Sequence, residues 1–283
     1  MIRSETLGKN VLTRVWTPLG PTRGDVLVLH GLGDHSARHD WAAGLVGGAG
    51  SRSVGFDWPG CGASDGVRGD IPTVEECCDL LDEMLDVLDL VPTGVFAHST
   101  GAFILLHWLA RRGRGIGALS SLRWVWLNSP LVRPSHSQPR LKIALATALA
   151  RWFPRMTLNT GVRARDCYHT GPDPLAEMAL ARAGVHHRVS LRFATSLLAE
   201  EGSLISEVGS ISPGIDFLLA QGCEDRVCPP VYAEELFRAL PDPQKTWVLA
   251  FGARHEPFRE SGSHGITDAV RAWLRSPERD LGK

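Results

Sequence analysis

Short apolar runs that end in polar or glycine-rich turns alternate with helical patterns along most of this chain of 283 residues. Nearly continuous apolar runs of this length are typical of strands that are buried on both faces. Between them, helices are expected at about 73–89, 101–112 and 231–240. The alternation predicts an α/β fold with a mostly parallel central sheet flanked by helices. The expected strands lie at 26–29, 53–56, 94–97, 124–127, 215–219 and 246–249.

The alternation stops between residues 132 and 213. An Ala/Leu-rich segment at about 139–153 predicts a helix there, and one or two further helices are expected before residue 198. We interpret 132–213 as a helical cap inserted after the sixth strand, with 1–131 and 214–283 forming the core domain. An apolar helix in a cap packs on the domain below it, lines a lipid pocket or contacts a membrane surface, and these alternatives stay open.

The bulk composition excludes several classes of partner. Thirty Lys and Arg residues nearly balance 31 Asp and Glu residues, for a net charge of -1, so no nucleic-acid partner is expected. The first residues lack the apolar stretch of a signal peptide, and no apolar run approaches the roughly 20 residues that span a bilayer. We therefore expect a cytoplasmic protein with reduced cysteines. Cys223 and Cys228 flank a loop without a second Cys/His pair at zinc spacing, so no metal site is predicted.

Ser99 lies where an apolar strand meets an apolar helical pattern, in the run Ala97-His98-Ser99-Thr100-Gly101. A nucleophilic serine in a sharp strand-turn-helix bend needs small residues two positions to either side. Gly101 meets this need, while Ala97 departs mildly from the usual glycine. The alternative is a serine that only caps the following helix. We interpret Ser99 as a candidate nucleophile.

A serine hydroxyl becomes a good nucleophile when a histidine takes its proton and a carboxylate orients that histidine. Asp225 follows the expected strand at 215–219, and His255 follows the one at 246–249. The order Ser, acid, His along the chain is the order this kind of fold requires. Glu224 is the rival acid and His264 the rival base, and both are less well placed relative to the strand ends.

Acyl transfer also needs hydrogen-bond donors for the oxyanion of the tetrahedral intermediate. The backbone N–H of Thr100 is one predicted donor, and that of Leu32, in the glycine-containing loop 30–36, is the other. This loop lacks the glycine spacing and lysine of a phosphate-binding loop. Gly31 and His98 are expected to line the substrate site, His98 as a structural hydrogen-bonding residue rather than a catalyst.

Several separate motifs together resemble the monoacylglycerol lipase and lysophospholipase branch of the α/β-hydrolases. They extend from about residue 25 to residue 260 and cover most of the chain. The motifs are the oxyanion loop His30-Gly31-Leu32-Gly33-Asp34-His35-Ser36-Ala37-Arg38, the turn Asp57-Trp58-Pro59-Gly60-Cys61-Gly62-Ala63-Ser64, the end of the cap at 173–175 and 189–193, the acid loop 222–229, and His255-Glu256-Pro257-Phe258-Arg259-Glu260.

The resemblance implies the α/β-hydrolase fold, no cofactor, and the roles of nucleophile, orienting acid and general base for Ser99, Asp225 and His255. It also implies a small acyl-ester substrate with one long acyl chain. Acyl-enzyme chemistry on another bond or acceptor (peptidase, thioesterase, acyltransferase) stays open, because one fold supports many such reactions. A non-catalytic binding protein on the same scaffold is the other alternative, and the oligomeric state is not predicted.

Overall fold

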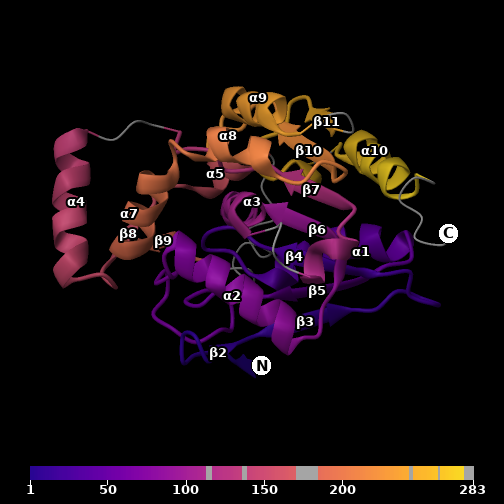
Figure 1. The fold of residues 1–283 in the computed structure, drawn as a ribbon. Coiled ribbons are helices and arrows are strands. Elements are labelled where there is room, and N and C mark those ends of the chain that lie inside the picture. Colours follow the sequence, from indigo (N-terminus) through magenta and orange to yellow (C-terminus); the bar gives the residue numbers. More distant parts are fainter. Residues whose placement is uncertain (113–116, 136–138, 170–183, 242–244, 261, 277–283) are drawn as a thin grey trace.

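A seven-stranded sheet forms the centre of the protein in a computed structural model that describes residues 1–112, 117–135, 139–169, 184–241, 245–260 and 262–276 (Figure 1). All neighbouring strands are parallel except the edge strand β3, which pairs antiparallel with β5. The order across the sheet is β11 (Lys245–Ala250), β10 (Asp216–Gly222), β7 (Trp124–Asn128), β6 (Pro92–His98), β4 (Asp25–Leu29), β5 (Arg52–Phe56) and β3 (Thr13–Trp16).

The six strands and three core helices expected from the sequence are all present. The sequence did not predict β3, because a four-residue edge strand with partly exposed side chains lacks the continuous apolar run of a buried strand. Two short strands nearer the N-terminus, β1 (Ile2–Arg3) and β2 (Asn10–Val11), pair only with each other within the described residues. Five strands of the main sheet, β3 to β7, precede the inserted segment. The segment therefore follows the fifth strand of that sheet and not the sixth.

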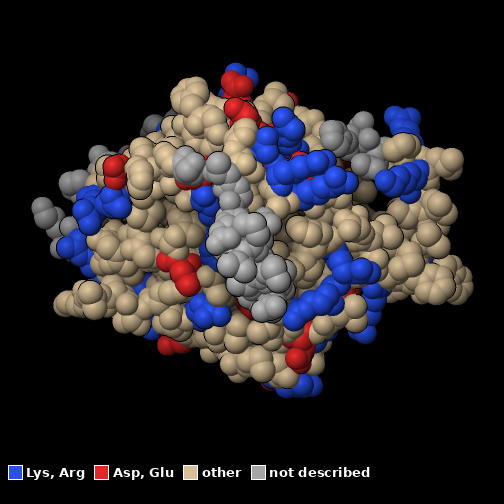
Figure 2. All heavy atoms as spheres, turned by 180° about the vertical axis from the view of Figure 1, so that it is seen from behind, with Lys and Arg blue, Asp and Glu red and all other residues tan. Residues whose placement is uncertain are grey.

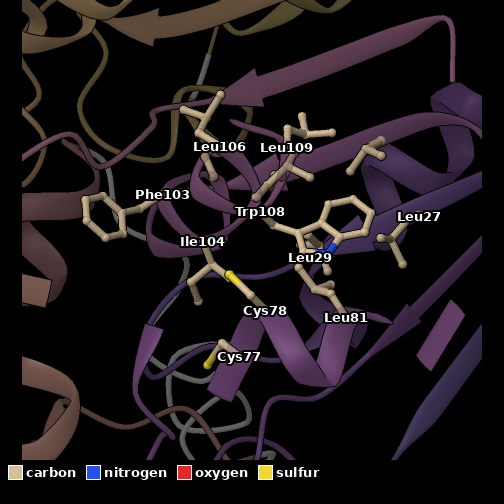
Figure 3. Packing of buried hydrophobic residues seen from close by; sticks show 14 of the residues in the cluster. Leu27, Leu29, Cys77, Cys78, Leu81, Phe103, Ile104, Leu106, Trp108 and Leu109 are labelled. Atoms are coloured by element: carbon tan, nitrogen blue, oxygen red, sulfur yellow. The ribbon is translucent and has the colours of Figure 1, made fainter. Parts of the chain in front are cut away.

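Helices cover both faces of the sheet and bury two apolar clusters. On one face, α2 (Val74–Val87), α3 (Thr100–Arg112), α8 (Leu204–Glu207) and α9 (Pro230–Ala239) contribute to the larger cluster. Figure 3 shows Cys78 and Leu81 of α2 beside Ile104 and Trp108 of α3. The other face carries α1 (Asp40–Gly48) and α10 (His264–Leu274). The sheet is thus buried on both sides, which explains its continuous apolar strands.

The sheet topology fixes where a ligand can bind. From β4 the chain proceeds to β5 on one side, whereas from β6 it proceeds to β7 on the other. Open parallel sheets bind ligands beyond the carboxyl ends of the strands at such a reversal of strand order. The segments that follow β4, β6, β10 and β11 all begin at this edge, and they contain Leu32, Ser99, Asp225 and His255.

The segment between β7 and β10 lies over this edge. It contains α4 (Arg140–Trp152), α5 (Ala164–Cys167) and α7 (Leu191–Glu200), together with strands β8 (Thr157–Asn159) and β9 (Arg188–Ser190), which the sequence did not predict. In Figure 1, α4 stands at the outer edge of the molecule, and it packs against α7. Part of the stretch, residues 170–183, lies outside the described residues. The division of the chain at 132 and 213 stays a prediction, and we call 132–213 the cap below.

Candidate active site

Ser99 occupies a strained turn between β6 and α3. Its φ of 51° lies in the left-handed region that side chains other than glycine rarely adopt. The turn packs so tightly that a Cβ on Gly101 would lie 2.5 Å from the carbonyl oxygen of His30. Ala97 still belongs to β6, and its methyl group is fully buried in the larger apolar cluster, so this position tolerates alanine. The local structure is that of a nucleophile elbow.

Three side chains from three separate loops form a chain of hydrogen bonds. The Nε2 atom of His255 lies 3.0 Å from Oγ of Ser99, and its Nδ1 atom lies 2.8 Å from Oδ2 of Asp225. All three residues are buried. The structure therefore brings together the nucleophile, base and acid predicted from the sequence, at distances suited to proton transfer.

Backbone and side-chain donors fix the orientation of the Asp225 carboxylate. Its Oδ1 atom accepts hydrogen bonds from the backbone N–H groups of Val227 and Cys228, both at 2.8 Å. Its Oδ2 atom accepts from Nε2 of Gln221 at 2.9 Å in addition to facing His255. The rival acid Glu224 lies half-exposed and pairs with His169 instead.

The Asp225 carboxylate also sets the proton affinity of His255. Burial alone would lower the pKa of His255, but the neighbouring carboxylate outweighs burial and holds this pKa well above 6.5. A histidine of raised pKa accepts a proton readily, and the hydrogen bond to Nδ1 leaves Nε2 facing the serine. The rival base His264 is exposed at the start of α10.

The loop after β4 passes directly beside Ser99. A Cβ on Gly31 would lie 3.0 Å from the Cβ of Ser99, so a glycine allows this approach. Leu32 and Thr100 both line the cavity into which Ser99 opens. Thr100 is the first residue of α3, where backbone N–H groups have no partner within the helix. The two predicted oxyanion donors thus belong to residues that line the same cavity as the serine.

His98 packs beside His255, and its imidazole is neutral at ordinary pH because it is buried. Its ring centroid lies 4.9 Å from that of His255, and its Nδ1 atom lies 3.0 Å from the carbonyl oxygen of Asn128. Burial holds the pKa of His98 well below its ordinary value. His98 also lines the cavity, so its neutral ring packs against His255 as a structural neighbour.

The cavity above Ser99 has a volume of about 1370 Å³, which exceeds most small-molecule sites. Its lining includes the reacting groups together with polar side chains, among them Arg38 and Glu256. The cap supplies apolar walls, among them Leu158, Val189, Phe193, Ala194, Leu197 and Leu198. A large cavity that combines reacting groups with a mostly apolar lining suits a ligand with a long apolar chain.

Two features of the site were not predicted from the sequence. The Sγ atom of Cys228 lies 4.0 Å from Oγ of Ser99, and burial raises the pKa of this thiol, so it stays neutral at ordinary pH. Arg38 pairs with Glu256 beside the triad. Cys228 belongs to the acid loop and Arg38 to the oxyanion loop. Nothing in the local sequence indicates that Cys228 lies beside Ser99 or that Arg38 pairs with Glu256.

Two groups of described residues have donor atoms close enough to hold a metal ion. One is Asp225, Cys228 and His255, whose carboxylate and imidazole already bind each other. The other is His107, Glu200 and Glu207, where the Arg111 guanidinium binds both carboxylates. A cation in either place would have to displace an existing ion pair, so neither group is built as a metal site.

The family model described as serine aminopeptidase, S33, matches residues 20–262. The chain belongs to this family. It is therefore a serine hydrolase with the α/β-hydrolase fold, as the motifs implied.

Individual relatives align with nearly the whole chain. Monoglyceride lipase of Mus musculus is 28% identical over 94% of this chain and 87% of its own length. The crystal structure of Paleococcus ferrophilus monoacylglycerol lipase has a TM-score of 0.80 and 29% identity, covering 94% of this chain and 99% of that one. An abhydrolase domain-containing protein of Dictyostelium discoideum is 24% identical over 93% of this chain, which spans only 27% of that longer protein.

Proposed function

We propose that this hydrolase cleaves monoacylglycerols, lysophospholipids or similar small esters of one long acyl chain, through an acyl-enzyme on Ser99. The observation that carries the proposal is the hydrogen-bonded chain of Ser99, His255 and Asp225, which opens into a large cavity with a mostly apolar lining. Similarity to proteins named monoglyceride and monoacylglycerol lipase supports the substrate class.

The geometry supports the following sequence of steps. His255 Nε2 accepts the Ser99 proton while Ser99 Oγ attacks the ester carbonyl carbon. The N–H groups of Leu32 and Thr100 donate to the oxyanion that forms. As the carbonyl reforms, the C–O bond to the alcohol breaks, and His255 gives its proton to the leaving oxygen. Water then attacks the acyl-enzyme with the same help from His255 and releases the fatty acid.

The size and the mostly apolar lining of the cavity predict a preference for a single long acyl chain. A matched series of monoacylglycerols from C4 to C18 is expected to show kcat/KM rising with chain length, because each buried CH₂ contributes about 0.8 kcal/mol. Rates of fatty-acid release, measured by titration, test this. Leu198→Ala, at a partly exposed position in the cavity wall, should weaken the dependence on chain length. Leu19→Ala, at an exposed position outside the cavity lining, should leave it unchanged.

Two outcomes of the same experiment would contradict the proposal. If amides or thioesters react while every monoacyl ester is inert, the substrate class is wrong. If ester is consumed only when a second alcohol is present and appears as a new ester, the reaction is acyl transfer rather than hydrolysis.

We also propose that the cap contacts an anionic lipid surface. The outward side of α4 exposes Leu141, Leu145 and Trp152, at 82%, 59% and 81%, and Phe153 follows at 59%. The chain has no Asp or Glu between residues 91 and 165. Seven cations stand within 132–165: Arg133, Arg140, Lys142, Arg151, Arg155, Arg163 and Arg165.

Residues 132–165 are thus strongly positive, although the net charge of the whole chain is only -1. In Figure 2, where the α4 side of the molecule is on the right, Lys and Arg side chains lie above and below an area of uncharged residues. We call the exposed side chains of Leu141, Leu145, Trp152 and Phe153 the apolar ridge. An apolar ridge with cations nearby suits a peripheral contact with anionic headgroups. Among the described residues no helix is long and apolar enough to cross a bilayer. A cytoplasmic location stays a prediction.

Removing the apolar ridge is expected to release the protein from vesicles. Burial of one such side chain is worth about 1.5–3 kcal/mol, so Leu141→Ser combined with Trp152→Ser should weaken binding by roughly tenfold or more. Co-sedimentation with phosphatidylglycerol-containing vesicles measures this, with Leu19→Ser as the matched exposed control. Equal binding to pure phosphatidylcholine vesicles would show that the cations take no part.

A further inference from the structure

A buried ion pair joins the loop that contains Leu32 to the loop that contains His255. The Nη2 atom of Arg38 donates to both carboxylate oxygens of Glu256, at 2.9 and 2.8 Å. Its Nη1 atom donates to Oδ1 of Asp34 at 2.9 Å. The Arg38 and Glu256 side chains are only 7% and 12% exposed, so one guanidinium holds two carboxylates from loops far apart in the sequence.

Further bonds hold each end of this bridge in place. Asp34 also pairs with Nε2 of His39 at 2.9 Å through its other oxygen. On the other side, Arg259 binds the Glu256 carboxylate through Nε at 2.9 Å and donates to the backbone carbonyl of Arg38 at 2.7 Å. The backbone N–H of Glu256 donates to the carbonyl of Cys167, at the end of α5, at 2.9 Å. The bridge therefore also reaches the cap.

The position of the bridge connects it to the reaction. Glu256 directly follows His255, and Asp34 lies two residues after Leu32 in a turn closed by a 3.4 Å hydrogen bond from Asp34 N–H to the Gly31 carbonyl. A shift of Glu256 would move Nε2 of His255 relative to Ser99. A shift of Asp34 would move the predicted oxyanion donor.

Stability alone is a weak reason for such a bridge. Replacing a buried ion pair with apolar side chains of similar volume is often neutral or stabilising, because both charges lose their hydration. A planar guanidinium that binds two carboxylates through two different nitrogens, by contrast, fixes the position of one carboxylate relative to the other. We propose that Arg38 is a positioning residue. Through Glu256 it holds the base His255, and through Asp34 the oxyanion loop, in a fixed position relative to Ser99. This inference rests on the proposed acyl-enzyme on Ser99.

The test separates catalysis from folding by counting active serines. Arg38→Met, Glu256→Met and the double variant are each titrated with a fluorophosphonate, and kcat is expressed per labelled site. A misplacement of about 1 Å can cost roughly 10²-fold in rate, so each single variant is expected to lose about 10- to 100-fold in kcat per site with KM little changed. The double variant should lose no more than the worse single variant, since both remove one bridge.

Arg52→Met is the matched control. Arg52 makes a bidentate ion pair with Asp25. The two residues begin β5 and β4, at the edge of the sheet opposite the active site, so loss of this pair should leave kcat per site unchanged. If Arg38→Met lowers only the number of labelled sites, the bridge serves folding and the inference is wrong. Equal losses in kcat per site for Arg52→Met would also overturn it. If the wild type is not labelled at Ser99 at all, the proposed function fails instead.

Discussion

Ser99→Ala is expected to lower kcat for ester hydrolysis by about 10⁶-fold, because removal of a triad nucleophile eliminates the covalent path. The same substitution should abolish labelling by a fluorophosphonate. Ser99 Oγ lies 3.0 Å from the base, in a strained backbone turn that holds it there. Initial rates with a p-nitrophenyl ester and mass spectrometry of the labelled peptide measure the two effects.

Two further variants make this result specific. Ser206→Ala changes an exposed serine on α8 and should retain both rate and labelling. Cys228→Ala removes the thiol that lies 4.0 Å from Ser99 Oγ, and labelling of Ser99 should persist. Loss of labelling in Cys228→Ala together with its retention in Ser99→Ala would assign the nucleophile to the thiol. That outcome is not expected, since burial keeps the thiol protonated.

The sheet and the reacting groups could be predicted because both depend on local patterns. A strand buried on both faces needs an unbroken apolar run, and β4, β6 and β10 show one. Parallel strands also bring their carboxyl ends to one edge, so chain order alone was enough to bring together residues as distant as Ser99 and His255.

Features that depend on tertiary partners could not be predicted in this way. The short strands β8 and β9 pair with each other although 28 residues separate them in the sequence. Neither strand has the continuous apolar run that would predict it. Arg38 and Glu256 are separated by 218 positions, and a charged residue in a loop is usually solvated, so their pairing has no local signal. The exposure of Leu141 and Trp152 likewise depends on what the cap leaves uncovered.

Asp225→Asn is expected to lower kcat by about 10⁴-fold while leaving the fold intact. The reason lies in the donors around the carboxylate. The N–H groups of Val227 and Cys228 cannot turn away from the Oδ1 position, so the asparagine oxygen must occupy that place. The asparagine NH₂ group then faces Nδ1 of His255, which can accept its hydrogen only as the tautomer protonated on Nε2. That tautomer cannot take the Ser99 proton.

The pH dependence of the rate gives a second, independent measure of the same contact. His255 must be neutral to act as a base, so the rate should fall as pH drops through its pKa, which the Asp225 carboxylate raises well above 6.5 against the effect of burial. In Asp225→Asn this charge is gone, and the pKa falls. The acid limb of kcat/KM should therefore move to lower pH, although the plateau is far lower.

Glu224→Gln provides the matched comparison for both effects. Glu224 is the neighbouring acid, and its carboxylate binds His169 at 2.8 Å, so the substitution should change neither the plateau nor the acid limb. A steep loss of rate in Glu224→Gln with a normal Asp225→Asn would make Glu224 the orienting acid. An unshifted acid limb in Asp225→Asn would instead mean that the titrating group is not His255. The effect of the Asp225 charge on His255 is thus tested twice, by the size of the rate loss and by the direction of the pH shift. An indirect effect on folding would lower the rate but would not shift the acid limb.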